Sequence, residues 1–169
     1  YFWLRPFEIF GCDIRLPPNG GMSMPEIGLS EKDLAYAAGL FDGEGCVSIY
    51  KIGNRRLNCA LYLRAQIVMT DPRPLQWMKQ RFGGSLTQRK RQKHYKVSFD
   101  WRLFSENDLQ FLELVRPFLI VKKDQAELAI EFQKISRRNK RKKNNPDNEV
   151  KLDLYGKVRD LKLVSYAAA

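Results

Sequence analysis

The chain has 169 residues, enough for one domain with a real hydrophobic core and short for two. Its 30 Lys and Arg residues outnumber 19 Asp and Glu residues, and the formal net charge of +11 favours a polyanionic partner, nucleic acid first, over an ordinary basic protein. The apolar runs are too short to span a bilayer, and no basic amphipathic helix with a clean apolar face favours a membrane surface. Three cysteines without a C-x-x-C pair exclude a zinc knuckle and a disulfide framework. We therefore expect a reducing intracellular compartment, either a prokaryotic or archaeal cytoplasm or an organelle.

The chain is predicted to contain one domain, residues 30–164, between two short extensions. Residues 1–29 include LPPNGGMSMP, whose Pro and Gly exclude a long helix or strand, so we expect an N-terminal arm there. The first helix should begin at Ser30, which is followed by Asp33 in the pattern of a capping box, and should stop at Gly43 or Gly45. Residues 165–169 form a tail whose three alanines resemble an addition made in cloning.

Two β-hairpins alternate with helices in the rest of the domain. CVSIYKI and NCALYLRAQIVM alternate around a turn at IGNRR, and SLTQRKRQ and HYKVSFDW form a second hairpin. Cys46 and Cys59 follow this alternation and are expected in the core. Between the hairpins, a helix should open at 71–72 and close at Gly83 and Gly84.

Three more helices complete an α+β plan. They are predicted over SENDLQFLELVRPF, over QAELAIEFQKI after Asp124, and over a last segment with a stripe of Val150, Leu154, Val158 and Leu161. The intervening SRRNKRKKNNPDN is expected to be a charged loop. Hairpins separated by helices give the order α-ββ-α-ββ-α-α-α, with antiparallel strands and no required parallel crossover.

The predicted strands have one apolar and one polar face. Along 57–67 the odd positions are apolar and the even positions are polar or mixed, and Thr87, Arg89, Lys96 and Ser98 should join the polar face. Such a face offers donors and acceptors to phosphates and base edges. An ordinary solvated sheet face has the same pattern, so this alternative stays open.

The segment AAGLFDGEG, residues 37–45, combines small residues with acids in a basic chain. On a helix, Ala35, Gly39 and Gly43 lie four residues apart and form a ridge with almost no side chain. Such a ridge predicts close packing, either with another helix or with the chain's own sheet. Glu44 follows at the negative end of the helix dipole, where an anion is disfavoured, so its carboxylate requires a cation.

These nine residues resemble the motif of the LAGLIDADG homing endonucleases, which ends in Asp-x-(Asp or Glu)-Gly. The resemblance implies an αββαββα core with a saddle-shaped antiparallel sheet and extra C-terminal helices. A single copy of the motif resembles the homodimeric branch, in which two motif helices cross at the dyad. It further implies that Glu44 and its twin in the second chain bind Mg²⁺, with Mn²⁺ or Ca²⁺ as possible occupants, and that Asp42 caps or bridges the helix end. The implied dimer contacts are Ala35, Gly39, Leu40 and Gly43.

A second segment, PFLIVKKDQAEL from Pro117, resembles the family's Pro-Phe-Leu-x-x-Lys-x-x-Gln-Ala, which implies that Lys122 approaches the cleavage centre. Arg73 matches a family basic residue near the site. The family's polar residue at the end of the long strand falls at Met69, whose thioether holds water poorly. We expect Gln66 to replace it, with Thr70 and Asp71 as alternatives.

The resemblance implies a homodimeric, metal-dependent endonuclease that cuts double-stranded DNA at a long pseudo-palindromic site. It also implies that the gene is intron-encoded. Two other functions on the same scaffold stay open: an intron RNA maturase, and a catalytically silent DNA-binding regulator. The side chains expected to read the major groove are Ser48, Tyr50, Asn54, Arg56, Tyr62, Arg64, Gln66, Arg89 and Lys96.

Overall fold

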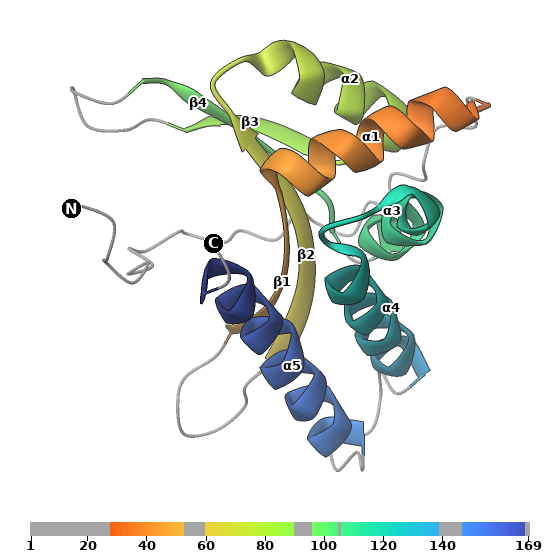
Figure 1. The fold of residues 1–169 in the computed structure, drawn as a ribbon, viewed down its shortest axis with the longest axis vertical. Helices are drawn as coiled ribbons and strands as arrows, with labels where there is room; N and C mark the ends of the chain where they lie inside the picture. The colour runs from red at the N-terminus through yellow and green to blue at the C-terminus, as the bar shows by residue number, and fades with distance from the viewer. Residues whose placement is uncertain (1–27, 53–59, 90–95, 105, 139–146, 168–169) are drawn as a thin grey trace.

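A computed structural model describes residues 28–52, 60–89, 96–104, 106–138 and 147–167. Within them the predicted α+β order is confirmed (Figure 1). The elements are α1 (Glu31–Glu44), β1 (Gly45–Ile52), β2 (Ala60–Met69), α2 (Pro72–Phe82), β3 (Ser85–Arg89), β4 (Ser98–Arg102), α3 (Glu106–Val115), the short 3₁₀ helix η1 (Arg116–Phe118), α4 (Lys123–Arg138) and α5 (Asp147–Ala167).

The four strands form one antiparallel sheet in the order β1-β2-β4-β3. Strand β1 pairs with β2 over its whole length, whereas β4 pairs with β2 only along Gln66–Met69. Where that pairing ends, the Ala65 amide donates to the buried Asp108 carboxylate at 2.7 Å, and the Ala65 carbonyl accepts from Leu103 at 3.0 Å. Helix α3 thus satisfies a strand amide that would otherwise be buried without a partner.

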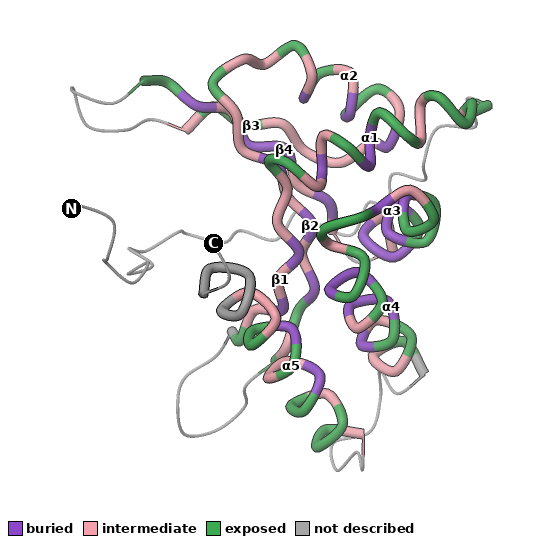
Figure 2. The backbone as a smooth tube through the Cα atoms, in the orientation of Figure 1, coloured by how far each residue is buried: buried purple, intermediate pink, exposed green. Residues whose placement is uncertain are grey.

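Helices cover the apolar face of the sheet, and the core lies between them. Figure 2 shows buried positions where α1, α3 and α4 meet the strands. Phe111 of α3 is at its centre, edge-to-face with Phe41, Phe82 and Trp101 at ring-centre distances of 5.1, 5.1 and 5.4 Å. Each such pair adds about 0.5–1.5 kcal/mol beyond its buried area. Phe41 belongs to the motif segment 37–45, so α1 is fixed to the core near its C-terminal end.

The predicted helix boundaries are confirmed by their caps. Ser30 accepts from the Asp33 amide at 3.2 Å, and the Asp33 carboxylate accepts in return from the Ser30 amide at 3.0 Å. Asp71 caps α2 by accepting from the Arg73 amide at 2.9 Å. Gly83 and Gly84 follow α2 with φ of 70° and 84°, and a Cβ on Gly84 would lie 2.5 Å from the Arg102 carbonyl. Only glycine suits that turn.

Three sequence expectations are wrong. Helix α4 continues through Arg138, into the segment expected as a loop, because Arg137 is a good helix former and also pairs with Glu106 of α3 at 2.5 Å. Val150 is 43% exposed, since the first turn of the long α5 extends beyond the core. Cys46 is half-buried opposite Gln66 on the polar face of the sheet, not in the core.

Other expectations fall where the structure gives less information. Residues 1–27 of the predicted arm, the 53–59 turn with Asn54, Arg56 and Cys59, and residues 168–169 lie outside the described residues. Helix α5 continues to Ala167, so the first three residues of the predicted tail are helical. In the part of the chain that the structure describes, no helix has the length and apolar character of a membrane span.

Candidate active site and polar sheet face

The C-terminal end of α1 presents an exposed carboxylate beside a tightly packed turn. Glu44 is the last residue of α1 and is exposed, and Gly45 begins β1 directly after it. The Gly45 amide donates to the Phe41 carbonyl. A Cβ on Gly45 would lie 2.3 Å from Phe41 Cδ2 and 2.5 Å from the Phe41 carbonyl oxygen. The last glycine of the motif therefore lets the chain turn over the buried Phe41, which places Glu44 at the edge of the sheet.

Asp42 binds the segment that precedes α4. Its carboxylate accepts hydrogen bonds from the backbone amides of Ile120 at 2.7 Å, Val121 at 3.2 Å and Lys122 at 2.9 Å. The Lys122 ammonium donates to the Asp42 carbonyl oxygen in return. We call these four hydrogen bonds the Asp42 clip. Because the clip fixes both ends of the lysine, Lys122 is held against the end of the motif helix.

The surroundings of the Lys122 ammonium shift its pKa. The pKa of Lys122 is lowered from its usual value, first because the ammonium is partly desolvated by burial. Attraction to Asp42, Cys46 and Glu44 opposes that effect, and repulsion from Lys162 adds to it. A desolvated lysine beside an exposed carboxylate is the kind of charge arrangement found at functional sites.

Sequence reasoning missed Lys162, which α5 brings to the same region. Its ammonium donates to the Ser48 hydroxyl and lies 3.3 Å from Cys46 Sγ. Cys46 Sγ and Ser48 Oγ are 3.1 Å apart. A signal was available, because Leu154, Val158 and Lys162 lie four residues apart, so a lysine continues the buried stripe of α5.

The other predicted catalytic residues, Arg73 and Gln66, lie on α2 and β2. Arg73 is exposed, and its Nε donates to both carboxylate oxygens of Asp71 at 3.0 Å. Within the described residues, no hydrogen bond or ion pair joins Arg73 to Glu44 or Lys122. Gln66 is half-buried on the polar face between Cys46 and Arg102. Met69 packs partly against the core.

The strand register confirms a continuous polar face. Ser48 lies opposite Arg64, and Tyr50 opposite Tyr62. The Arg64 guanidinium stacks over the Tyr50 ring at 4.5 Å, and Tyr62 is 44% exposed. Lys96 is exposed just before β4.

Sequence reasoning also missed an ion-pair cluster on this face. Asp100 of β4 is completely buried beneath two arginines, accepting from Arg89 Nε at 2.7 Å and from Arg102 Nε at 2.8 Å. Asp100 and Arg102 alternate with Trp101, which is the pattern of a strand with a polar face, but their partner could not be read from it. The cluster keeps one net positive charge and holds two guanidinium groups in fixed orientations.

Three of the four residues that we expect in a dimer contact lie on one exposed side of α1, and Leu40 is the exception. Ala35, Gly39 and Gly43 are exposed, and a Cβ on either glycine would meet nothing within 4 Å. Leu40 is half-buried against the core.

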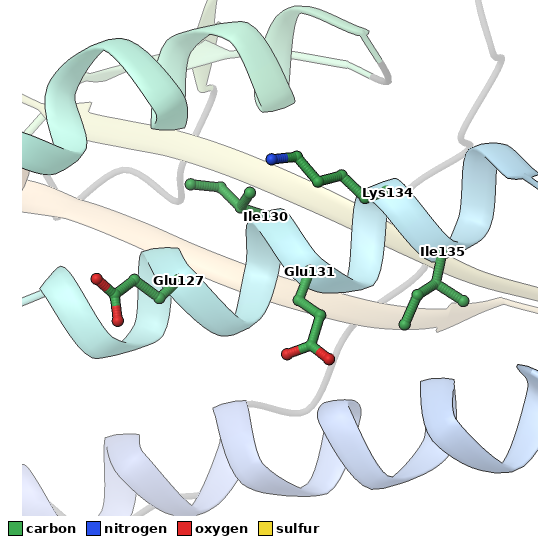
Figure 3. A pocket seen from close by; sticks show the side chains of 5 residues that line it. All are labelled: Glu127, Ile130, Glu131, Lys134 and Ile135. Atoms are coloured by element: carbon green, nitrogen blue, oxygen red, sulfur yellow. The ribbon is translucent and has the colours of Figure 1, made fainter.

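A separate groove on α4 brings none of these residues together. It is lined by Glu127, Ile130, Glu131, Lys134 and Ile135, and Figure 3 shows Glu131 and Ile135 directed towards α5. All five side chains belong to α4, which packs against α5, so we interpret the groove as a seam between these helices.

Comparisons with known proteins agree with this geometry. The family model described as LAGLIDADG endonuclease matches residues 37–123, just over half of the chain. A search of curated proteins finds no match.

Solved structures share the fold. The homing endonuclease I-CvuI, in complex with its target in the presence of Ca, is 22% identical with a TM-score of 0.62, over 77% of this chain and 82% of that chain. The archaeal intron-encoded I-Vdi141I, complexed with DNA, is 16% identical with a TM-score of 0.65, over 77% and 84%. I-SmaMI, bound to an uncleaved DNA target with calcium ions, is 17% identical with a TM-score of 0.59, over 79% of this chain but 46% of that chain. The family match spans the motif segment 37–45, the whole sheet and the Asp42 clip, and it shows that the chain belongs to the LAGLIDADG endonuclease family.

Proposed function

We propose that the protein is a metal-dependent endonuclease that cuts double-stranded DNA as a homodimer at a long pseudo-palindromic site. One observation carries the proposal: the Asp42 clip holds the partly desolvated Lys122 against the end of the helix that carries Glu44, at the edge of a polar sheet face. The DNA complexes of the structural relatives I-CvuI and I-Vdi141I support this choice of substrate. An anionic duplex also suits a chain with a net charge of +11.

Glu44 is the residue that we propose as the metal ligand. The described residues contain no group of three acids, histidines or cysteines that would form a complete metal site. The Asp42 carboxylate is occupied by three amides, so each chain offers one free-standing carboxylate at this point. That fits Mg²⁺, which usually binds through one or two carboxylates together with phosphate oxygens and water. When bound, such an ion supplies charge stabilisation to the phosphate and acidifies a water molecule.

Lys122 would then stabilise negative charge on the phosphate. Its ammonium is partly desolvated, so its attraction to a phosphate is less screened than that of a surface lysine. The clip fixes its position before DNA binds, which reduces the reorganisation required during the reaction. Gln66 and Arg73 stay proposed members of the site, on the family resemblance alone.

We propose that two copies pair through α1. The exposed Ala35–Gly39–Gly43 ridge supports pairing because it lets a second helix approach closely. In the adjoining clip segment, Ile120 is 87% exposed and Val121 is 67% exposed. Apolar side chains of this kind are typically buried in the core of a dimer interface. Pairing would bring the second Glu44 to the site. The match to 46% of the I-SmaMI chain also supports a functional unit made of two such folds.

The polar sheet face is the proposed reading surface. Tyr50, Tyr62, Arg64 and Arg89 lie on it with Arg102, and Lys96 lies next to it. Arginines held by Asp100 are suited to bidentate contacts with guanine in the major groove.

Cleavage of a randomised duplex library tests the proposal. With Mg²⁺ the protein should cut a selectable site, and Glu44→Gln should slow cutting of that site by at least about 100-fold, the scale of a lost charge-stabilising group. Glu31→Gln, at the exposed opposite end of α1, is the matched control and should cut normally. Specific DNA binding that ignores Glu44→Gln, without nicking, would favour the regulator, and selective RNA binding would favour the maturase.

Sedimentation tests the dimer separately. Gly39→Leu should convert a dimer to a monomer because the side chain fills the ridge. Gly156→Leu is the matched control, since Gly156 is another helical glycine with nothing within 4 Å of its Cβ position, on α5. An unchanged mass for Gly39→Leu would contradict pairing through α1.

A further inference from the structure

Helix α5 places a lysine on the polar face of the sheet, next to the proposed cleavage site. Leu154 and Val158 are 3% and 2% exposed and hold α5 against the core, and Lys162 follows one turn later on the same stripe. Its ammonium contacts Ser48 and Cys46 of β1, side chains that share a face with Arg64 and Gln66. Helix packing therefore directs Lys162 to one point on the sheet.

That point is close to Glu44 and Lys122. Cys46 is two residues beyond Glu44, about 7 Å along an extended strand. Repulsion between the Lys162 and Lys122 ammonium groups contributes to the lowered pKa of Lys122. Holding two like charges together on a half-buried surface costs free energy, and a bound anion between or beside them removes that cost.

We propose that Lys162 binds a backbone phosphate next to the scissile phosphate, and that Ser48 and Cys46 position Lys162 and do not read bases. The inference rests on the proposed function. The displacement of about 7 Å from Glu44 along the strand is comparable to the separation of neighbouring phosphates on one DNA strand, so Lys162 can reach the phosphate beside the one that is cut. Lys162 would fix the strand on one side of the cut while Lys122 acts at the cut itself.

The alternative is that Lys162 only docks α5 on the sheet. Both roles predict some loss of stability on substitution, but only a phosphate contact changes the salt dependence of DNA binding. Each lost phosphate contact lowers the slope of log K against log salt concentration by about 0.9. A docking contact leaves that slope unchanged.

The experiment uses the duplex recovered from the randomised library, without divalent metal, and measures binding from low to moderate salt. Lys162→Met keeps most of the apolar stem and should lower the slope by about 0.9 for each subunit on the duplex. Lys162→Arg keeps the charge and should restore it. Lys157→Met is the matched control, because Lys157 lies on the same helix, pairs with Asp153 at 2.7 Å and is attracted to Glu131 of α4.

Four results distinguish the possibilities. A lowered slope in Lys162→Met, restored in Lys162→Arg and absent in Lys157→Met, supports the phosphate contact. An unchanged slope with a lowered unfolding midpoint in both Lys162→Met and Ser48→Ala overturns it in favour of docking. A wild-type protein that binds no duplex overturns the proposed function and this inference together, whereas wild-type cleavage with an unchanged Lys162→Met slope overturns only the inference.

Discussion

The Asp42 clip makes a quantitative prediction for Asp42→Asn. The carboxylate accepts three amide hydrogen bonds, two at Oδ2 and one at Oδ1. An asparagine keeps its oxygen for Ile120 and Val121, but its NH₂ group then faces the Lys122 amide, donor against donor. Lys122 also occupies the N-cap position of α4, since its carbonyl accepts from Ala126 at 2.9 Å, so the substitution removes an anion from a helix N-terminus.

We estimate the loss at about 2 kcal/mol. A lost hydrogen bond to a charged group costs about 1.5–3 kcal/mol, and the helix-terminus effect adds about 0.3–1 kcal/mol. The lower part of that range applies because the lost hydrogen bond, from the Lys122 amide, is only partly buried. Urea unfolding should show a lower midpoint at an unchanged m-value. Cleavage should fall further than the folded fraction does, because a displacement of about 1 Å at a reacting group can cost on the order of 100-fold in rate.

Asp124→Asn is the matched control for this prediction. It removes the same charge from the exposed first turn of α4, two residues after Lys122, and should cost no more than about 1 kcal/mol. It should also leave cleavage near the wild-type rate. If Asp42→Asn and Asp124→Asn unfold and cut alike, the clip does not hold the lysine in place.

Other substitutions test the remaining features. Gly45→Ala forces a methyl group into Phe41 and should cost about 1–3 kcal/mol in a denaturation midpoint, while Gly156→Ala, in open space, should not destabilise. Lys122→Met should raise the free energy of unfolding at neutral pH while abolishing cleavage. The pKa of Lys122 is lowered in the folded state, so burial of its charge reduces the free energy of unfolding. This cost is complete below the folded-state pKa and fades as the pH rises towards the unfolded-state pKa. The stability gained by methionine should therefore shrink in denaturation curves recorded at alkaline pH. Asp100→Asn should release two arginines and relax the base preference of the selected site, which a repeat of the library selection would detect.

Much of the fold could be predicted because its signals are local. The capping box of Ser30 and Asp33 and the Asp71 cap each depend on a few residues that are neighbours in the sequence, and they mark where α1 and α2 begin. Strand alternation likewise fixes which residues share a face, whatever the strand pairs with. The sequence therefore predicts where these two helices begin and which strand residues share a face.

The contacts that complete the candidate site depend on long-range docking. Asp100 reaches Arg89 only through the β3–β4 register, which the alternating pattern does not determine. The contact of Lys162 with Ser48 depends on where α5 packs, and its position on a stripe shows only that it faces inward. Val150 has the same apolar character as Val158, yet it is exposed because the core ends before the helix does. Cys46 follows the same logic: strand alternation alone does not decide which face a cysteine occupies.

The Asp42 clip joins residues 78 to 80 positions apart in the chain. During synthesis, the motif helix is therefore complete long before the segment that contains Lys122 leaves the ribosome. A truncated or half-made product contains Glu44 without its lysine. For the proposed nuclease, cutting would therefore begin only after translation has passed the start of α4, because Lys122 cannot be held against the end of α1 before then.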